Sequence, residues 1–107
     1  MNNEYRTFCL FTSKIDPKIY VVGRDSKNST ADITIPKTED TVGRNHIYLT
    51  ITADGRYYIN EPADTTNGTF VENNGEWSKT KGCFLDSRTP LKLGNYRTTV
   101  ESLLKPL

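Results

Sequence analysis

Residues 47–60, IYLTITADGRYYIN, hold the clearest structural signal of the chain. In the first five of these residues the apolar side chains alternate, so that Ile47, Leu49 and Ile51 share one face of a strand. A glycine-containing connection, residues 53–55, then leads into a second segment rich in aromatic and β-branched residues. The stretch therefore predicts a β-hairpin with one buried face.

Similar short segments, separated by Gly, Pro, Asn and Asp, extend in both directions from this hairpin. The further expected strands are residues 5–11, 19–22, 32–35, 69–72, 76–77, 83–85, 91–93 and 96–100. Asn73-Asn74-Gly75 predicts a second hairpin turn, and residues 101–104 fit either a last strand or one helical turn. Many short strands at this spacing predict an all-β sandwich or barrel.

Length and composition restrict the function further. The chain has 107 residues, which predicts one domain spanning residues 1–107. Fourteen Lys and Arg against 13 Asp and Glu give a net charge of +1, which argues against a nucleic-acid partner bound through many phosphates. No apolar run approaches the roughly 20 residues of a membrane span, and no signal peptide is evident. We expect a cytoplasmic, monomeric domain without a membrane partner, alone or within a longer chain.

The residue types needed for catalysis or metal binding are scarce. Cys9, Cys83 and His46 lack the close spacing of zinc ligands, and two reduced, largely buried thiols are favoured over a single disulfide. His46 is the sole histidine, and neither a nucleophile elbow nor a Walker-type phosphate loop is present. We therefore expect no catalytic residue, no metal and no cofactor. Detectable turnover abolished by a His46 substitution would revive an enzymatic hypothesis.

Three long loops instead carry groups suited to a phosphate. Gly23-Arg24 opens the first, residues 43–46 (Gly-Arg-Asn-His) belong to the second, and residues 64–69 (Asp-Thr-Thr-Asn-Gly-Thr) belong to the third. Arginine forks bind phosphate oxygens bidentately, and hydroxyls and amides satisfy the remaining acceptors. If the loops meet at one end of the sandwich, they predict an anion site. The alternative interpretation is a pair of solvated loop arginines.

The order of these motifs resembles the forkhead-associated (FHA) domain, a module that recognises phosphothreonine peptides. The family pattern is Gly-Arg at a strand end, then Ser-x-x-His, then Asn-Gly before a hydrophobic strand, and it is matched here over about residues 20–100. The sequence of residues 93–100 resembles that of bacterial members of the FHA family. The resemblance implies a sandwich of two twisted antiparallel sheets, with the binding loops at one apex and a phosphothreonine-containing protein or peptide as partner.

The resemblance also implies a role for each matching residue. The implied phosphate-binding residues are Arg24, Gly43, Arg44 and Thr66, the implied peptide-binding residue is Asn67, and the implied loop-supporting residues are Gly23, His46 and Gly68. Arg24 matches the arginine that pairs with the phosphate, and Asn67 matches the asparagine that hydrogen-bonds the peptide main chain. His46 matches the histidine that braces the binding loop.

One position departs from the family pattern. Gly43 stands where the phosphate-binding serine is expected, so one charge-assisted hydrogen bond, worth roughly 1.5–3 kcal/mol, is missing. The Gly43 amide, Thr41 or Arg44 can compensate. Alternatively, the domain has weakened or lost its phosphate dependence and scaffolds a larger assembly through another surface of the sandwich.

Overall fold

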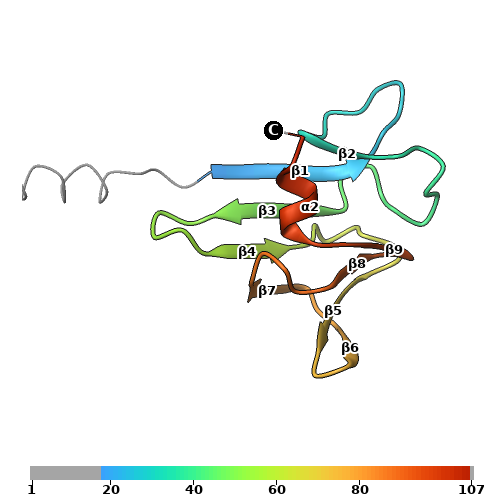
Figure 1. The fold of residues 1–107 in the computed structure, drawn as a ribbon. Helices are drawn as coiled ribbons and strands as arrows, with labels where there is room; N and C mark the ends of the chain where they lie inside the picture. Colours follow the sequence, from blue (N-terminus) through green and yellow to red (C-terminus); the bar gives the residue numbers. More distant parts are fainter. Residues whose placement is uncertain (1–17, 107) are drawn as a thin grey trace, which may run out of the picture.

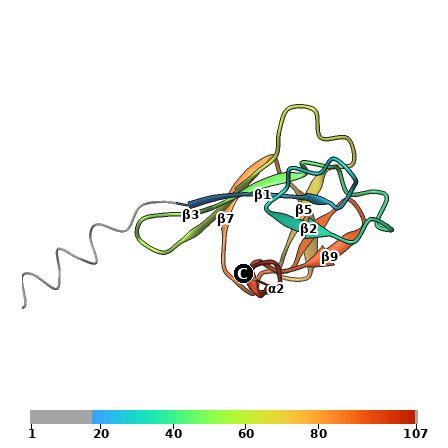
Figure 2. The ribbon, with the colours of Figure 1, turned by 90° about the horizontal axis from the view of Figure 1, so that it is seen from above.

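The computed structural model describes residues 18–106, so the strand expected at residues 5–11 and Cys9 lie outside the described residues. One sheet has five strands in the order β2-β1-β3-β4-β7, and the other has four in the order β6-β5-β8-β9 (Figures 1 and 2). The five are β1 (Lys18–Arg24), β2 (Ile33–Ile35), β3 (Ile47–Ile51), β4 (Tyr57–Asn60) and β7 (Gly82–Leu85). The four are β5 (Thr69–Asn73), β6 (Glu76–Lys79), β8 (Leu91–Leu93) and β9 (Tyr96–Thr98).

The expected all-β sandwich is confirmed, with one correction to its strand directions. All pairs are antiparallel except β1 and β2, which run parallel, so the five-stranded sheet is mixed. The chain returns from the end of β1 to pair Asp32 with Val21: the Asp32 amide donates to the Val21 carbonyl, and the Val21 amide donates to the Asp32 carboxylate, both at 2.8 Å. This pairing starts β2 beside the middle of β1.

Both predicted hairpin turns are present. Strands β3 and β4 pair across residues 52–56, and β5 pairs with β6 across Asn74-Gly75. Asn74 and Gly75 have φ values of 54° and 85°, as a two-residue hairpin turn with both central residues in the left-handed region requires. The turn signals therefore located the strand ends to within one residue, since β5 includes Asn73 and β4 begins at Tyr57 rather than Arg56.

The end of the chain forms a short helix, α2 (Val100–Leu104), rather than a last strand. The Thr99 side chain caps it by accepting a hydrogen bond from the Ser102 amide at 3.1 Å. Val100 and Leu103 are buried, so the turn of helix closes one end of the core. Within residues 18–106, no helix is long and apolar enough to cross a membrane.

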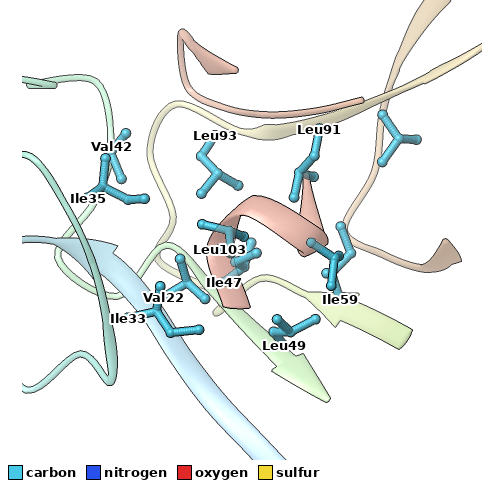
Figure 3. Packing of buried hydrophobic residues seen from close by; sticks show 12 residues of the cluster. Val22, Ile33, Ile35, Val42, Ile47, Leu49, Ile59, Leu91, Leu93 and Leu103 are labelled. Carbon is cyan, nitrogen blue, oxygen red and sulfur yellow. The ribbon is translucent and has the colours of Figure 1, made fainter. Parts of the chain in front are cut away.

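The core lies between the two sheets and is built from the inward-facing residues of each. Figure 3 shows Leu91 and Leu93 on one side of the cluster, Val22 and Leu49 on the other, and Leu103 between them. Leu49, Leu91 and Leu93 are 0% exposed. Cys83 on β7 is only half-buried, so this thiol is less enclosed than expected. The packed sheets form a rigid frame from which the loops at the ends of β1, β2, β4 and β8 project.

Candidate functional site

The predicted loops meet at one apex of the sandwich, where the end of β1 is hydrogen-bonded to the loop between β2 and β3. The Arg24 amide donates to the Gly43 carbonyl at 2.9 Å, and the His46 amide donates to the Val22 carbonyl at 2.8 Å. Gly23 lies directly against this loop, since a Cβ built on it would be 1.7 Å from the Arg44 carbonyl oxygen. The contact requires glycine because only a residue without a side chain allows the two backbones to approach so closely.

His46 joins the second loop to the third. Its side chain is 0% exposed. The Gly43 amide donates to its Nδ1 at 2.9 Å, and its Nε2–H donates to the Gly68 carbonyl at 2.8 Å. The neutral imidazole with hydrogen on Nε2 satisfies both bonds, so His46 lies in the loop-supporting position and not on the solvent-facing rim.

Asn67 and the turn between β8 and β9 are linked through Thr41. The Asn67 Nδ2 group donates to the Thr41 carbonyl at 2.9 Å, and the Asn95 amide donates to Thr41 Oγ1 at 2.9 Å. The Gly94 amide donates to the Gly68 carbonyl at 3.0 Å, which ties the same turn to the third loop. The Asn67 side chain is exposed and keeps its amide oxygen and one amide hydrogen for a ligand.

Arg24 is held in place while most of its guanidinium stays available. Its Nε–H donates to the Val42 carbonyl at 2.9 Å, and the side chain is half-buried. Within residues 18–106 its terminal nitrogens have no hydrogen-bond partner and no carboxylate within 4.0 Å. Arg44 and Thr66, on the neighbouring loops, are exposed. The apex therefore presents one fixed guanidinium fork, a second, exposed guanidinium and a hydroxyl.

The profile of the FHA domain matches residues 20–96. The chain belongs to the FHA domain family. Among similar solved structures is the FHA domain of the CT664 protein from Chlamydia trachomatis, with 25% identity, a TM-score of 0.58, and coverage of 75% of this chain and 71% of that chain. No curated protein matches the chain.

Two yeast structures share the fold. The N-terminal FHA domain of S. cerevisiae Rad53p, solved with a phosphothreonine peptide, has 19% identity and a TM-score of 0.55, covering 88% of this chain and 69% of that chain. The yeast Pml1 splicing factor, described with its integration into the RES complex, has 24% identity and a TM-score of 0.50, covering 73% of this chain and 54% of that chain. The FHA fold thus occurs in proteins from bacteria and yeast.

In this FHA domain the amide of Gly43 is not free for a ligand. It donates to His46 Nδ1, so it does not replace the missing serine hydroxyl as an anion donor. Thr41, the other compensating residue considered above, is half-buried and accepts bonds from Asn67 and Asn95. Arg44 is exposed and has no carboxylate within 4.0 Å among residues 18–106, which leaves it as the strongest compensating group.

The loops around the apex of the FHA domain are, on balance, acidic. Arg24 and loops 25–32, 36–46 and 61–68 together hold four cations and six carboxylates. The cations are Arg24, Lys27, Lys37 and Arg44, and the carboxylates are Asp25, Asp32, Glu39, Asp40, Glu61 and Asp64. The apex loops therefore have no overall basic field, and an anion would be attracted there only through direct contacts with the arginine side chains.

Several supporting residues of the FHA domain carried no clear signal in the sequence. Thr41 acts mainly through a backbone carbonyl, which any residue possesses. Gly94, at φ 59°, lies close to Thr41: a Cβ added to Gly94 would lie 2.4 Å from the Thr41 carbonyl oxygen. The Glu61 carboxylate is 3% exposed, accepts from Thr69 Oγ1 at 2.8 Å and lies 3.7 Å from Lys81 Nζ. The sequence predicts the Gly94-Asn95 turn, but it does not predict that this turn contacts Thr41.

Stability of the FHA domain should depend on the protonation of His46. Burial lowers the pKa of this imidazole from its ordinary 6.5, against smaller upward effects of the Gly68 carbonyl and the Glu61 charge. As the pH falls, the unfolded chain therefore takes up the proton before the folded domain does. The contribution of neutral His46 to the free energy of unfolding is fully present above pH 6.5 and is lost as the pH falls through the lower pKa of the folded state.

Chemical denaturation at pH 7.5 and at stepwise lower pH tests this dependence. The free energy of unfolding of the parent domain should begin to fall just below pH 6.5. A His46→Gln variant should start from lower stability and lack that part of the pH dependence. Parallel pH profiles for the two proteins would assign the dependence to carboxylates instead.

Proposed function

We propose that this FHA domain recognises phosphothreonine-containing peptides at its apex and acts as a signalling adaptor. The observation that carries the proposal is the Arg24 guanidinium, held by its Nε–H on the Val42 carbonyl with its terminal nitrogens unpaired among residues 18–106. A pre-positioned fork of this kind loses little freedom when it binds a phosphate bidentately. The phosphothreonine peptide bound to the similarly folded Rad53p domain supports the same class of ligand.

Each exposed group at the apex has a place in this interaction. Arg24 and Arg44 pair with the phosphate dianion, and the Thr66 hydroxyl donates to one of its oxygens. The free amide hydrogen and oxygen of Asn67 hydrogen-bond the peptide main chain beside the phosphothreonine, which sets its direction. His46 and Gly68 maintain the loop positions without touching the ligand. No catalytic role is proposed, and a cytoplasmic location stays a prediction from the sequence.

Binding of peptide libraries distinguishes this function directly. Phosphothreonine peptides should bind, and their unphosphorylated and phosphoserine counterparts should bind much more weakly, as measured by calorimetry. Inorganic phosphate should compete at high concentration. Equal binding of phosphorylated and unphosphorylated peptides would refute the proposal.

Restoring the missing hydroxyl should strengthen the site. A Cβ at Gly43 would lie 3.6 Å from His46 Nδ1, an ordinary contact, so Gly43→Ser fits without displacing the imidazole. A new hydrogen bond to the phosphate of roughly 1.5–3 kcal/mol predicts about a ten- to hundredfold gain in phosphopeptide affinity. Gly43→Ala is the matched control and should leave the affinity unchanged. A serine variant that binds no better than the alanine variant would show that position 43 does not face the phosphate.

A second candidate is phosphate-independent scaffolding through the five-stranded sheet. Strand register places Ile19, Thr50, Tyr58 and Phe84 in one row across its outer face. Ile19 is 65% and Phe84 is 54% exposed, although the solvent-facing side of an antiparallel sheet is ordinarily polar. In this case Ile19→Lys would weaken partner binding while Gly43→Ser leaves it unchanged.

A further inference from the structure

The outer face of the four-stranded sheet carries cations and aromatic rings together. Residues Val71, Leu91 and Leu93 point into the core, so their neighbours along the strands point outward. The register aligns outward residues in one row across β9, β8, β5 and β6. That row is Arg97, Lys92, Phe70 and Lys79, and the paired residues Glu72 and Trp77 lie beside it on the same face. We call these six residues the basic face.

Two of the three cations of the basic face, Lys92 and Arg97, lie over its rings. Lys92 Nζ is 4.7 Å from the centre of the Trp77 ring and 5.3 Å from that of Phe70, and Arg97 Cζ is 5.4 Å from the Trp77 ring. Among residues 18–106, no carboxylate lies within 4.0 Å of Lys79, Lys92 or Arg97. The rings hold Lys92 and Arg97 over the sheet, while the outward N–H groups of these two side chains stay available to an anion.

The basic face is continuous with the apex. A Cβ built on Gly68 would lie 3.0 Å from Lys79 Cε and 3.4 Å from Phe70 Cζ, so both side chains lie against the residue that follows Asn67. A peptide bound beside Asn67 therefore meets Lys79 first when its chain continues over the four-stranded sheet. Lys92 and Arg97 follow in the same row.

The charges of the two surfaces are opposite. The apex loops carry more carboxylates than cations, whereas the basic face carries three cations and one carboxylate, Glu72. Acidic residues next to a phosphothreonine are repelled by the apex carboxylates and attracted by the face that begins at Lys79. A peptide with an acidic segment beside its phosphothreonine therefore extends from the apex over the basic face.

We propose that the basic face is a second docking surface, which binds an acidic segment flanking the phosphothreonine on the same partner protein. This proposal rests on the phosphothreonine site proposed above. Lys79, Lys92 and Arg97 pair with Asp or Glu side chains of the flank, and Phe70 and Trp77 provide the apolar surface beneath them. The domain thereby selects phosphothreonine sites that have acidic neighbours.

Trp77 is the only tryptophan of the chain, so its fluorescence reports directly on the basic face. The probes are phosphothreonine peptides with a flank of about eight residues, spanning about 26 Å, which is either acidic or neutral and placed on either side of the phosphothreonine. One acidic flank should raise the affinity about tenfold at low salt and change the Trp77 emission, and the gain should shrink as salt is added. The neutral flank should bind without changing the emission.

Charge-reversal variants assign the effect to the face. Lys92→Glu with Arg97→Glu should abolish the gain from the acidic flank and leave binding of the neutral peptide within about twofold. Lys18→Glu with Lys105→Glu makes the same change in net charge at two exposed residues outside the face and should keep the gain. Circular dichroism verifies that both double variants are folded.

Each remaining outcome has a definite meaning. Equal affinity for acidic and neutral phosphopeptides would overturn the basic-face proposal and leave the phosphothreonine site standing. An unphosphorylated acidic peptide that changes the Trp77 emission, together with no binding of any neutral phosphopeptide, would support the face and refute the phosphothreonine site. A single-stranded oligonucleotide that displaces the acidic peptide with higher affinity would identify the face as a nucleic-acid surface and overturn the proposal.

Discussion

Replacing Gly23 by alanine is expected to destabilise the domain by about 3 kcal/mol and to lower its Tm by roughly 15 °C. The added Cβ would lie 1.7 Å from the Arg44 carbonyl oxygen and 2.4 Å from its carbon. Both are backbone atoms, so no rotation of a side chain relieves the overlap. The loop from residue 36 to 46 must move away from β1, and the bonds from the Arg24 and His46 amides are strained or lost.

Thermal unfolding followed by circular dichroism measures this effect. Gly43→Ala is the control, because its Cβ makes only ordinary contacts with His46 and should change the Tm by a few degrees at most. Phosphopeptide affinity at a temperature where Gly23→Ala is still folded should also fall, since the displaced loop carries Gly43 and Arg44. A Gly23→Ala protein that melts with the parent domain would show that β1 and this loop are not in contact.

Replacing Arg24 by alanine should reduce phosphopeptide affinity by about a hundredfold or more. The variant removes two charge-assisted hydrogen bonds of roughly 1.5–3 kcal/mol each. Arg24→Lys should recover only part of the affinity, because an ammonium neither forks onto two phosphate oxygens nor keeps the Nε bond to the Val42 carbonyl. Calorimetry with one phosphothreonine peptide measures all three proteins.

Arg44→Ala is the matched comparison for Arg24. Arg44 is exposed, and among residues 18–106 no hydrogen bond or ion pair positions its side chain, so its loss should lower the phosphopeptide affinity about tenfold. The Tm of Arg24→Ala should fall by only a few degrees, which separates binding from folding. Undiminished phosphopeptide binding by Arg24→Ala would refute the proposed site.

Most of the fold was predictable because its signals are local. Alternation of apolar residues in 47–51 identified β3, and Asn74-Gly75 identified the turn between β5 and β6. The parallel pairing of β2 has no local signal, because it depends on the contact of Asp32, just before β2, with Val21 of β1. Residues 101–104 are too short for their pattern to distinguish a strand from a helical turn, and the structure decides for the helix through the bond from the Ser102 amide to Thr99.

The candidate site was predictable only in part. Arg24, His46 and Asn67 have distinctive side chains in a recognisable order, and the structure brings their loops together. The supporting role of Thr41 has no motif in the sequence, because it consists of one bond to its backbone carbonyl and one to its hydroxyl oxygen, both from residues far away along the chain. The amide of Gly43 looked available from the sequence, and only the three-dimensional arrangement shows that the imidazole accepts its hydrogen.

The enclosure of the chain's one histidine provides a built-in spectroscopic reporter. Nitrogen-15 labelling would give a single pair of imidazole signals, one from a bare nitrogen and one from a nitrogen that carries hydrogen. Any partner or substitution that separates the second loop from the third would collapse this asymmetric pair toward the averaged values of a free ring. The integrity of the whole apex can thus be followed through two resonances, without labels placed on the ligand.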